Sequence, residues 1–519
     1  MIDKEVILKY LLKWYTLLGF IVLYVFFQTV VRDAILSKKL GCKNPPYLWK
    51  VKILGLITLN ELLTAKRQGN LTEYLGGLFA RYPTDTFYVR YGHVLKMVVT
   101  LDPENMKAVL ATQFNDFSLG RRHVHFEPLL GDGVFTLDGE AWKFTRGMLR
   151  PQFAREQVGH VQLLEPHVQV LAKHIELYNG KTFDIQKLFF QFTVDTSTQF
   201  LFGESVHSLY DDHLGLPTPN NIPERDGFAE AFGVSQTYLA TRAYSQILHH
   251  LFNTPEFRRC NRKVQALAKY YVTLALSYSP EELEKKSRDN YTFLYELVKQ
   301  TRNPKMLQDQ LLNIMVAGRD TTAGLLSFTL FELARNPLVW QKLKDEIYAK
   351  FGYGDEARLD EITFESLKKC EYLKIVLQEA LRMYPSVPIN FRMATKDTTL
   401  PRGGGKDGTW PIFIPKGSSV AYSVYLTHRL KKYYGEDAEM FRPERWYDLK
   451  KLGWAYLPFN GGPRICLGQQ FALTEASYVI TRLVQMFPNI STMDPNYPPK
   501  KLIHLTMSLQ DGANIKLWT

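Results

Sequence analysis

This chain is organised around one stretch of ten residues, Phe459-Asn460-Gly461-Gly462-Pro463-Arg464-Ile465-Cys466-Leu467-Gly468. Its glycines and proline cannot continue a helix or a central strand, so the stretch predicts a tight loop. The next residues, Gln469 to Gln485, carry apolar side chains at helical spacing. Cys466 therefore lies just before a helix N-terminus, where the partial positive charge favours a thiolate over a thiol. A thiolate in this setting suits metal ligation.

A lone cysteine is usually a small buried hydrophobic residue. The spacing F-x-x-G-x-R-x-C-x-G argues against that here, because five fixed residues at roughly 5% usage each match by chance on the order of 10⁻⁴ of the time. The stretch resembles the haem-ligand loop of the cytochrome P-450 superfamily. The resemblance implies that Cys466 is the axial ligand to the iron of haem b, that Arg464 pairs with a haem propionate, and that Phe459 packs over the sulfur.

Composition predicts one large globular domain. Hydrophobic residues make up 45% of the 519 residues, and no linker-like or repetitive block follows about residue 70. Lysine and arginine outnumber aspartate and glutamate by 64 to 52, a net charge of +12, which suits nucleic acid, an anionic membrane or an acidic protein. No nucleic-acid motif accompanies the charge, so we expect no nucleic-acid partner. The four scattered cysteines favour a reducing compartment without disulfides.

The N-terminal region predicts a membrane anchor after a short tail, residues 1–13. The stretch from Trp14 to Val31 has no charged residue, and as a helix it spans roughly 27 Å. A cleaved signal peptide is the alternative, but no small-x-small cleavage site follows. Basic residues flank both sides, so charge favours a cytoplasmic C-terminal side only slightly. We expect a single-pass protein of the endoplasmic reticulum membrane whose catalytic domain faces the cytosol and contacts membrane lipid.

Residues 32–70 are expected to form a linker, and residues 71–519 the main domain. Asn44-Pro45-Pro46-Tyr47 predicts a stiff elbow, and Val51 to Leu63 a short helix that is either a membrane-surface element or part of the core. Thr86 to Val99 alternates and breaks at Gly92-His93, which predicts a β-hairpin. Most of the remaining chain looks helical. The expected fold class is mainly α with small β-sheets (α+β).

Three further arginine and tryptophan residues are candidates for haem binding. Trp142 and Arg146 lie four residues apart, so they share a helical face on which an indole N–H and a guanidinium suit an anionic group. W-x-x-x-R alone usually means a solvated arginine beside a core tryptophan. Beside the cysteine loop, it resembles the second propionate site of the P-450 family. Arg392 occupies a position that the family often uses for a propionate, and it is a candidate for that role.

A long apolar helix, Asp309 to Arg335, is predicted with a polar interruption, Ala317-Gly318-Arg319-Asp320-Thr321-Thr322. An ionisable pair and a glycine in a buried helix cost stability, and such costs often mark a site. Gly318 lets a flat ligand approach the backbone, and the Thr321 hydroxyl can bond back to the Ala317 carbonyl. The alternative is a kinked surface helix with an exposed aspartate. The resemblance implies an oxygen-binding groove in which Asp320 and Thr321 relay protons.

A structural cluster is implied by the resemblance as well. Glu379 and Arg382 lie three residues apart in the apolar helix Leu373 to Met383, a pattern that alone usually means a weak surface ion pair. With Arg445 in Pro443-Glu444-Arg445-Trp446, the pair matches the family's Glu-Arg-Arg cluster that braces the haem loop.

The branch of the family is indicated by Leu400 to Gly408, Phe114 to Gly120 and the Asn44–Tyr47 elbow, which resemble yeast enzymes that hydroxylate n-alkanes and fatty acids at or near the chain end. The resemblance covers residues 14 to 519. It implies a monooxygenase that uses O2 and takes NADPH electrons from a separate NADPH-cytochrome P-450 reductase, since the chain has no dinucleotide or flavin motif. Lys143 and Arg150 are candidates for docking that acidic partner.

Other functions stay open at this stage. A sterol or other lipid is the alternative monooxygenase substrate. A haem-thiolate isomerase or dehydratase is disfavoured because it has no need of the Asp320-Thr321 relay. The alternative that is not an enzyme is a haem-binding membrane protein without catalytic activity. Arg121 and Arg122 are either carboxylate partners or solvated loop arginines.

Overall fold

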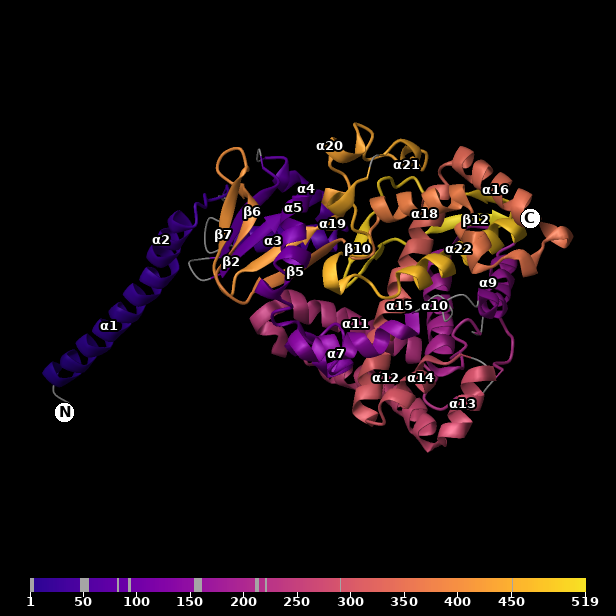
Figure 1. The fold of residues 1–519 in the computed structure, drawn as a ribbon, viewed down its shortest axis with the longest axis horizontal. Coiled ribbons are helices and arrows are strands. Elements are labelled where there is room, and N and C mark those ends of the chain that lie inside the picture. Colours follow the sequence, from indigo (N-terminus) through magenta and orange to yellow (C-terminus); the bar gives the residue numbers. More distant parts are fainter. Residues whose placement is uncertain are drawn as a thin grey trace.

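The computed structural model describes residues 4–46, 56–81, 84–91, 95–153, 161–210, 214–219, 222–289, 291–449 and 451–519. These residues form a mainly helical molecule with small β-sheets, as the sequence predicts. The strands β2, β5, β6 and β7 gather near the base of the N-terminal helices, and longer helices make up much of the rest of the body (Figure 1).

Helices account for most of the described chain. They are α1 (Lys4–Phe26), α2 (Arg32–Lys39), α3 (Leu56–Arg67), α4 (Leu71–Phe79), α5 (Pro103–Lys107), α6 (Arg122–Leu130), α7 (Gly139–Leu149), α9 (Glu165–Leu177), α10 (Ile185–Phe202), α11 (Phe228–Ser245), α12 (Pro255–Ser277), α13 (Pro280–Asp289), α14 (Phe293–Gln300), α15 (Pro304–Leu333), α16 (Pro337–Phe351), α17 (Phe364–Lys368), α18 (Glu371–Met383), α19 (Val424–Thr427), α20 (Lys431–Tyr434), α21 (Arg445–Asp448) and α22 (Gln469–Met486). The short helical turns used below are η1 (Phe27–Val31), η2 (Ala108–Thr112), η6 (Gln246–Phe252) and η10 (Gly462–Arg464).

The largest sheet has the strand order β1-β2-β8-β5-β3. β1 (Thr86–Tyr91) and β2 (Leu95–Thr100) pair antiparallel, which confirms the predicted hairpin, although its turn lies outside the described residues. β2 runs parallel to β8 (Ser419–Ser423), which pairs antiparallel with β5 (Ile389–Ala394), and β5 with β3 (Phe117–Ser118). The smaller sheets are β6 (Thr398–Gly404) with β7 (Trp410–Ile414), β4 (Phe183–Asp184) with β12 (Asn514–Trp518) and β9 (Asn489–Ser491), and β10 (Lys501–Ile503) with β11 (Met507–Leu509).

The helix α15 runs through the centre of the molecule and contacts α10, α12, α18 and α22. It begins five residues before the predicted start because Asn303 accepts a hydrogen bond from the Met306 N–H and Pro304 occupies the first helical position. Its first half packs in one hydrophobic core and its second half in another. Residues 316–321, between the two cores, are half-buried, whereas the helix on both sides of them is mostly buried. The polar interruption therefore lies where the two cores separate.

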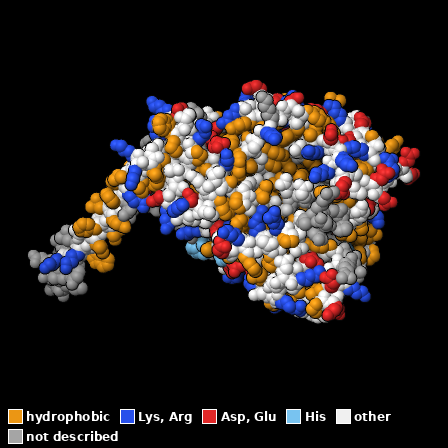
Figure 2. Space-filling view, in the orientation of Figure 1, with side chains coloured by type: hydrophobic (Ala, Val, Ile, Leu, Met, Phe, Trp, Pro, Cys, Tyr) orange, Lys and Arg blue, Asp and Glu red, His pale blue; other side chains and the backbone are white. Residues whose placement is uncertain are grey.

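The first helix projects from the body of the molecule (Figure 1). α1 ends at Phe26 and continues as the π-helical turn η1, so the predicted span from Trp14 to Val31 is divided between two elements. Large apolar side chains of α1, such as Trp14 and Phe20, are exposed along it (Figure 2). Measured by length and hydropathy together, no helix within the described residues qualifies as a membrane span.

The predicted linker contacts the β6–β7 hairpin. The Lys43 N–H donates to the Pro411 carbonyl at 2.9 Å, and the Gly405 N–H donates to the Asn44 carbonyl at 3.1 Å. Tyr47, the last residue of the predicted elbow, lies outside the described residues. The predicted short helix from Val51 to Leu63 falls partly outside them too, and α3 covers its second half. The elbow is thus held against a hairpin at the edge of the body.

A buried carboxyl group ties α22 to α10. Glu475 is 3% exposed and accepts a hydrogen bond from the Thr196 hydroxyl at 2.6 Å. Burial raises the pKa of Glu475 from its ordinary 4.5 to about 7. Between these two values the folded protein keeps a proton that the unfolded chain has lost. The stability that this proton provides is complete below the pKa of the unfolded chain, 4.5. It is lost as the pH rises through the pKa of the folded protein, about 7.

We therefore expect Glu475→Gln to become relatively more stable as the pH rises. Its unfolding free energy, compared with that of the unsubstituted protein, should increase by about 2–3 kcal/mol between about pH 5 and about pH 8. Urea unfolding at several pH values measures this difference. Glu176→Gln, at an exposed position on α9, is the control. A difference that does not change with pH would show that Glu475 is ionised in the folded protein throughout this range.

Candidate active site

The cysteine loop is closed by backbone contacts that exclude side chains. The Cys466 N–H donates to the Phe459 carbonyl at 3.0 Å. Gly462 has a φ of +69°, and a Cβ on it would collide with the carbonyl oxygen of Leu110 in η2. A Cβ on Gly461 would lie 2.6 Å from the ring of Trp454. The glycines therefore let the loop pack against its neighbours as closely as it does.

The Cys466 thiol is exposed and yet lies in a setting that is unfavourable for negative charge. Its side chain is accessible, yet burial among protein atoms raises the pKa of the thiol. The Gly468 N–H and the Arg146 guanidinium act in the opposite direction but do not outweigh burial. The expectation that the loop alone favours a thiolate is therefore wrong, because desolvation is the larger effect. A bound metal cation favours the thiolate, as in other thiolate metal sites.

The helix α7 contacts the cysteine loop through the predicted Trp142 and Arg146. Arg146 donates to the Ile465 carbonyl at 2.8 Å. Its guanidinium carbon lies 5.8 Å from the Trp142 ring, so the two side chains do share a face. Arg464 lies 4.2 Å from the same ring and donates to Asp138 at 2.7 Å. The buried Nε1 of Trp142 has no hydrogen-bond acceptor within the described residues, so it is free to donate to a ligand.

Two more arginines complete a cluster of positive charge. Arg122 on α6 donates to the Asn390 side-chain oxygen at 2.8 Å, and Arg392, which is 3% exposed, contacts the same oxygen at 3.3 Å. Burial and the other guanidinium groups lower the pKa of Arg122 to about 9, and burial lowers that of Arg464 to about 10. Asp138 is the carboxylate that acts against both shifts.

This excess of buried positive charge fits an anionic ligand with more than one carboxylate, such as the two propionates of haem. The unpaired Trp142 N–H and the accessible Cys466 thiol fit the same group, the first as a donor and the second as the iron ligand. The sequence predicted Trp142, Arg146, Arg392 and Arg464. It left Arg122 open and missed the amide of Asn390, because no helical or strand spacing connects α6 with β5.

The polar interruption of α15 has the predicted local geometry. The Thr321 hydroxyl donates to the Ala317 carbonyl at 2.6 Å. A Cβ on Gly318 would lie 3.0 Å from the Ser197 hydroxyl of α10, so this glycine permits a close helix–helix approach. Burial raises the pKa of Asp320, and the neighbouring Arg319 opposes that shift. Asp320 is enclosed rather than on a surface helix, so the surface alternative is wrong.

The Glu-Arg-Arg cluster is buried behind the cysteine loop. Glu379 accepts hydrogen bonds at 2.9 Å from both Arg382 and Arg445, and each of the three side chains is at most 1% exposed. The cluster continues to the loop through His428. Leu457 N–H donates to Nε2 of His428 at 2.8 Å, so Nδ1 carries the proton and donates to the Arg382 carbonyl at 3.1 Å. The sequence missed His428, whose ring contacts Arg382 and Leu457, both far from it in the chain.

These features fit the site of a haem-thiolate protein, and comparison with known proteins shows the same family. The family model for cytochrome P450 matches residues 54–515. This chain belongs to the cytochrome P450 family. Cytochrome P450 52A3-A of Candida maltosa is 64% identical over 98% of each chain, and cytochrome P450 52A6 of Candida tropicalis is 64% identical over 100% of each. Cytochrome P450 52A13 of Debaryomyces hansenii is 58% identical over 98% of each.

A solved structure supports the fold of this cytochrome P450. The haem domain of cytochrome P450DA superposes with a TM-score of 0.67 at 20% identity, covering 86% of this chain and 91% of that one. The predictions of a cytochrome P450 fold, a haem cofactor and a monooxygenase of the yeast alkane and fatty-acid hydroxylase branch are confirmed. The isomerase and non-catalytic alternatives lose their support.

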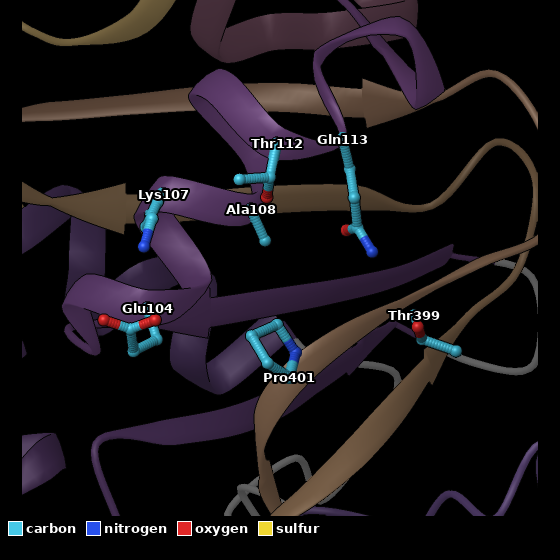
Figure 3. A pocket seen from close by; sticks show the side chains of 7 residues that line it. All are labelled: Glu104, Lys107, Ala108, Thr112, Gln113, Thr399 and Pro401. Carbon is cyan, nitrogen blue, oxygen red and sulfur yellow. The ribbon is translucent and has the colours of Figure 1, made fainter.

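A separate hollow of about 260 Å³ lies among α5, η2 and β6 (Figure 3). Its walls combine charged, polar and apolar side chains: Glu104, Lys107, Ala108, Thr112, Gln113, Thr399 and Pro401. None of them belongs to the haem-binding set. The hollow and the cysteine loop contact the same turn, η2, because Ala108 and Thr112 line the hollow and Leu110 lies against Gly462.

Proposed function

We propose that this cytochrome P450 hydroxylates long-chain fatty acids, n-alkanes or both at or near the terminal carbon. The observation that carries the proposal is the half-buried segment 316–321 of α15, a short polar stretch with mostly buried helix on both sides of it. An apolar chain can lie along such a helix, with hydrogen-bonding groups only at the reacting end. The high identity to the 52A relatives supports the same substrate class.

The residues divide into three roles. Cys466 would hold the iron, and the Phe459 ring would lie over its sulfur. Arg464, Trp142, Arg146 and Arg392 would hold the propionates, and Gly318 would leave room for the flat group. Asp320 and Thr321 hold and pass protons near the reacting carbon. Bound haem supplies O2 activation and insertion of one oxygen atom into a C–H bond. The chain's own groups orient the substrate, exclude water and deliver protons.

NADPH-cytochrome P-450 reductase is the proposed electron donor, and it docks on α7. Lys143 and Arg150 are exposed there beside Phe144, which is 62% exposed, and Ile465, which is 41% exposed. Arg146 joins this surface directly to the cysteine loop. Apolar side chains within a basic rim suit an acidic protein partner.

Charge reversal should weaken this docking. We expect Lys143→Glu with Arg150→Glu to raise the apparent KM for reductase about tenfold at low salt, without changing the ferrous–carbon monoxide spectrum. Steady-state rates over a range of reductase concentrations measure the change. Lys406→Glu, at an exposed position in the β6–β7 loop, is the matched control. An unchanged KM for the double variant would exclude α7 as the docking surface.

The proposed location is the endoplasmic reticulum membrane, with a single N-terminal pass and the catalytic domain in the cytosol. The exposed apolar side chains of α1 support it. So does a second surface at the end of α11 and in η6, where Tyr244, Leu248 and Leu251 are 50%, 52% and 65% exposed. Lys66 of α3 lies 3.9 Å over the Tyr244 ring. Sedimentation with phospholipid vesicles should show weaker binding without residues 4–31, and weaker still with Leu248→Ser and Leu251→Ser.

The substrate proposal is tested on membranes that contain the protein and reductase. Fatty acids and n-alkanes of graded length, and a sterol, are supplied with NADPH, and mass spectrometry locates the new hydroxyl group. We expect NADPH-dependent hydroxylation at or next to the terminal carbon of the aliphatic substrates. Turnover of the sterol alone would favour the alternative lipid substrate, and turnover without NADPH would contradict the monooxygenase mechanism.

A further inference from the structure

Arg319 is a charged residue in the middle of α15 that aromatic side chains of α10 and α11 flank. Its side chain is 12% exposed. Its guanidinium carbon lies 5.3 Å from the ring of Phe190 on α10 and 5.5 Å from the ring of Phe232 on α11. Cations attract aromatic faces at these distances, and more strongly away from water. The guanidinium therefore has a defined position between two helices that pack against α15.

The side chain of Asp320, the next residue, forms an ion pair with Arg319. Nη1 of Arg319 lies 3.4 Å from Oδ1 of Asp320, and the Asp320 side chain is only 16% exposed. Oδ1 has no hydrogen-bond donor within the described residues, and the Nε of Arg319 has no acceptor there. Adjacent residues on a helix point in different directions. The two aromatic rings thus flank the guanidinium at the position from which it reaches the carboxylate.

We propose that Arg319 is a positioning residue for oxygen activation, and that it holds the Asp320 carboxylate in place beside Thr321 so that a proton can pass. This inference rests on the proposed relay role of Asp320 and Thr321. Arg319 itself does not contact substrate or the reacting atoms. Phe190 and Phe232 act through it, by fixing the guanidinium.

Electrostatics agrees with this geometry. Burial raises the pKa of Asp320, and Arg319 is the one charged group described that lowers it. The described groups that α10 and α11 place against this segment are uncharged. Gly318 faces the Ser197 hydroxyl of α10, and Arg319 faces Phe232 and Gly233 of α11. An acid that relays protons works best when its pKa is near the working pH. Without Arg319, Asp320 would stay protonated to higher pH.

The products formed for each NADPH consumed show whether protons are delivered correctly. Productive turnover converts RH, O2, NADPH and H⁺ to ROH, H2O and NADP⁺. When protons arrive at the wrong oxygen atom, O2, NADPH and H⁺ instead give H2O2 and NADP⁺. Both outcomes consume one NADPH, so the ratio of alcohol to peroxide measures how well protons are directed. A change that only weakens substrate binding or folding lowers the rate. It gives no reason for the pH dependence of the alcohol-to-peroxide ratio to change.

The test uses the full-length protein with reductase and a fatty acid. We expect Arg319→Gln to lower the alcohol formed per NADPH by about threefold or more and to raise peroxide correspondingly, with the pH of best coupling moved upward. The haem content and the ferrous–carbon monoxide spectrum should stay those of the parent. Arg319→Lys keeps the positive charge and should retain more than about half of the coupling. Lys305→Met removes a cation from another buried acid on α15, Asp309, and should couple like the parent.

A double-mutant cycle separates this inference from the function on which it rests. If Arg319 acts only through Asp320, adding Arg319→Gln to Asp320→Asn should change the coupling no further. An additional loss in the double variant would overturn the proposal, because Arg319 would then act by another route. Normal coupling in Arg319→Gln alone would overturn it too. Normal coupling in Asp320→Asn would instead remove the proposed relay, and with it the basis of this inference.

Discussion

Replacing Cys466 with serine is expected to abolish monooxygenase activity, to below about 1% of the parent rate, and the carbon monoxide band at about 450 nm. Serine has nearly the same shape, so the loop closed by the Cys466 N–H and the Phe459 carbonyl should persist. A hydroxyl is a much poorer source of electron density for iron than a thiolate. The difference spectrum of the reduced, carbon monoxide-treated protein measures ligation, and product formation with reductase measures activity.

The control for this variant is Cys260→Ser on α12. Cys260 is a half-buried free thiol outside the haem-binding set, so its loss should leave both the spectrum and the rate unchanged. If Cys466→Ser retained the parent spectrum, sulfur at position 466 would not be the iron ligand. The roles inferred for the loop, the arginine cluster and the polar segment of α15 would then all need revision.

Replacing Glu379 with glutamine is expected to destabilise the protein by about 3–5 kcal/mol and to prevent stable haem incorporation. The carboxylate receives hydrogen bonds from Arg382, Arg445 and the Trp446 indole, all at 2.9–3.0 Å. Glutamine keeps the shape but removes the buried anion that pairs with Arg382, and it leaves Arg445 with Asp437, at 3.1 Å, as its carboxylate partner. The strain should reach the haem loop through His428 and Leu457. Urea unfolding and haem content per protein measure the effect.

Glu371→Gln is the matched control on the same helix. Glu371 lies in the first turn of α18 and is exposed, so the same chemical change should cost little. Stability equal to the parent in Glu379→Gln would show that the two arginines find other acceptors. Loss of stability without loss of haem would show that the cluster supports the fold but does not brace the loop.

Much of this site could be predicted from the sequence because its parts are local. The loop from Phe459 to Gly468 specifies its own turn, since glycine permits φ values that other residues avoid. Trp142 and Arg146 share a face through helical spacing, and Thr321 reaches Ala317 for the same reason. The start of α15 was placed too late because the cap at Asn303 was not recognised. The ionisation of Cys466 was predicted wrongly because burial is not visible in a motif.

The sequence by itself determined the cysteine loop, the polar segment of the central helix and the family, because each depends on residues within a turn or two of one another. Only the tertiary structure decided how those parts act together. It brought Arg122 and Arg392 onto one amide oxygen, connected the Glu379 cluster to the loop through His428, and placed Arg319 between two aromatic rings beside Asp320. These contacts join segments far apart in the chain. Packing and desolvation set them, and neither has a periodic signal in the sequence.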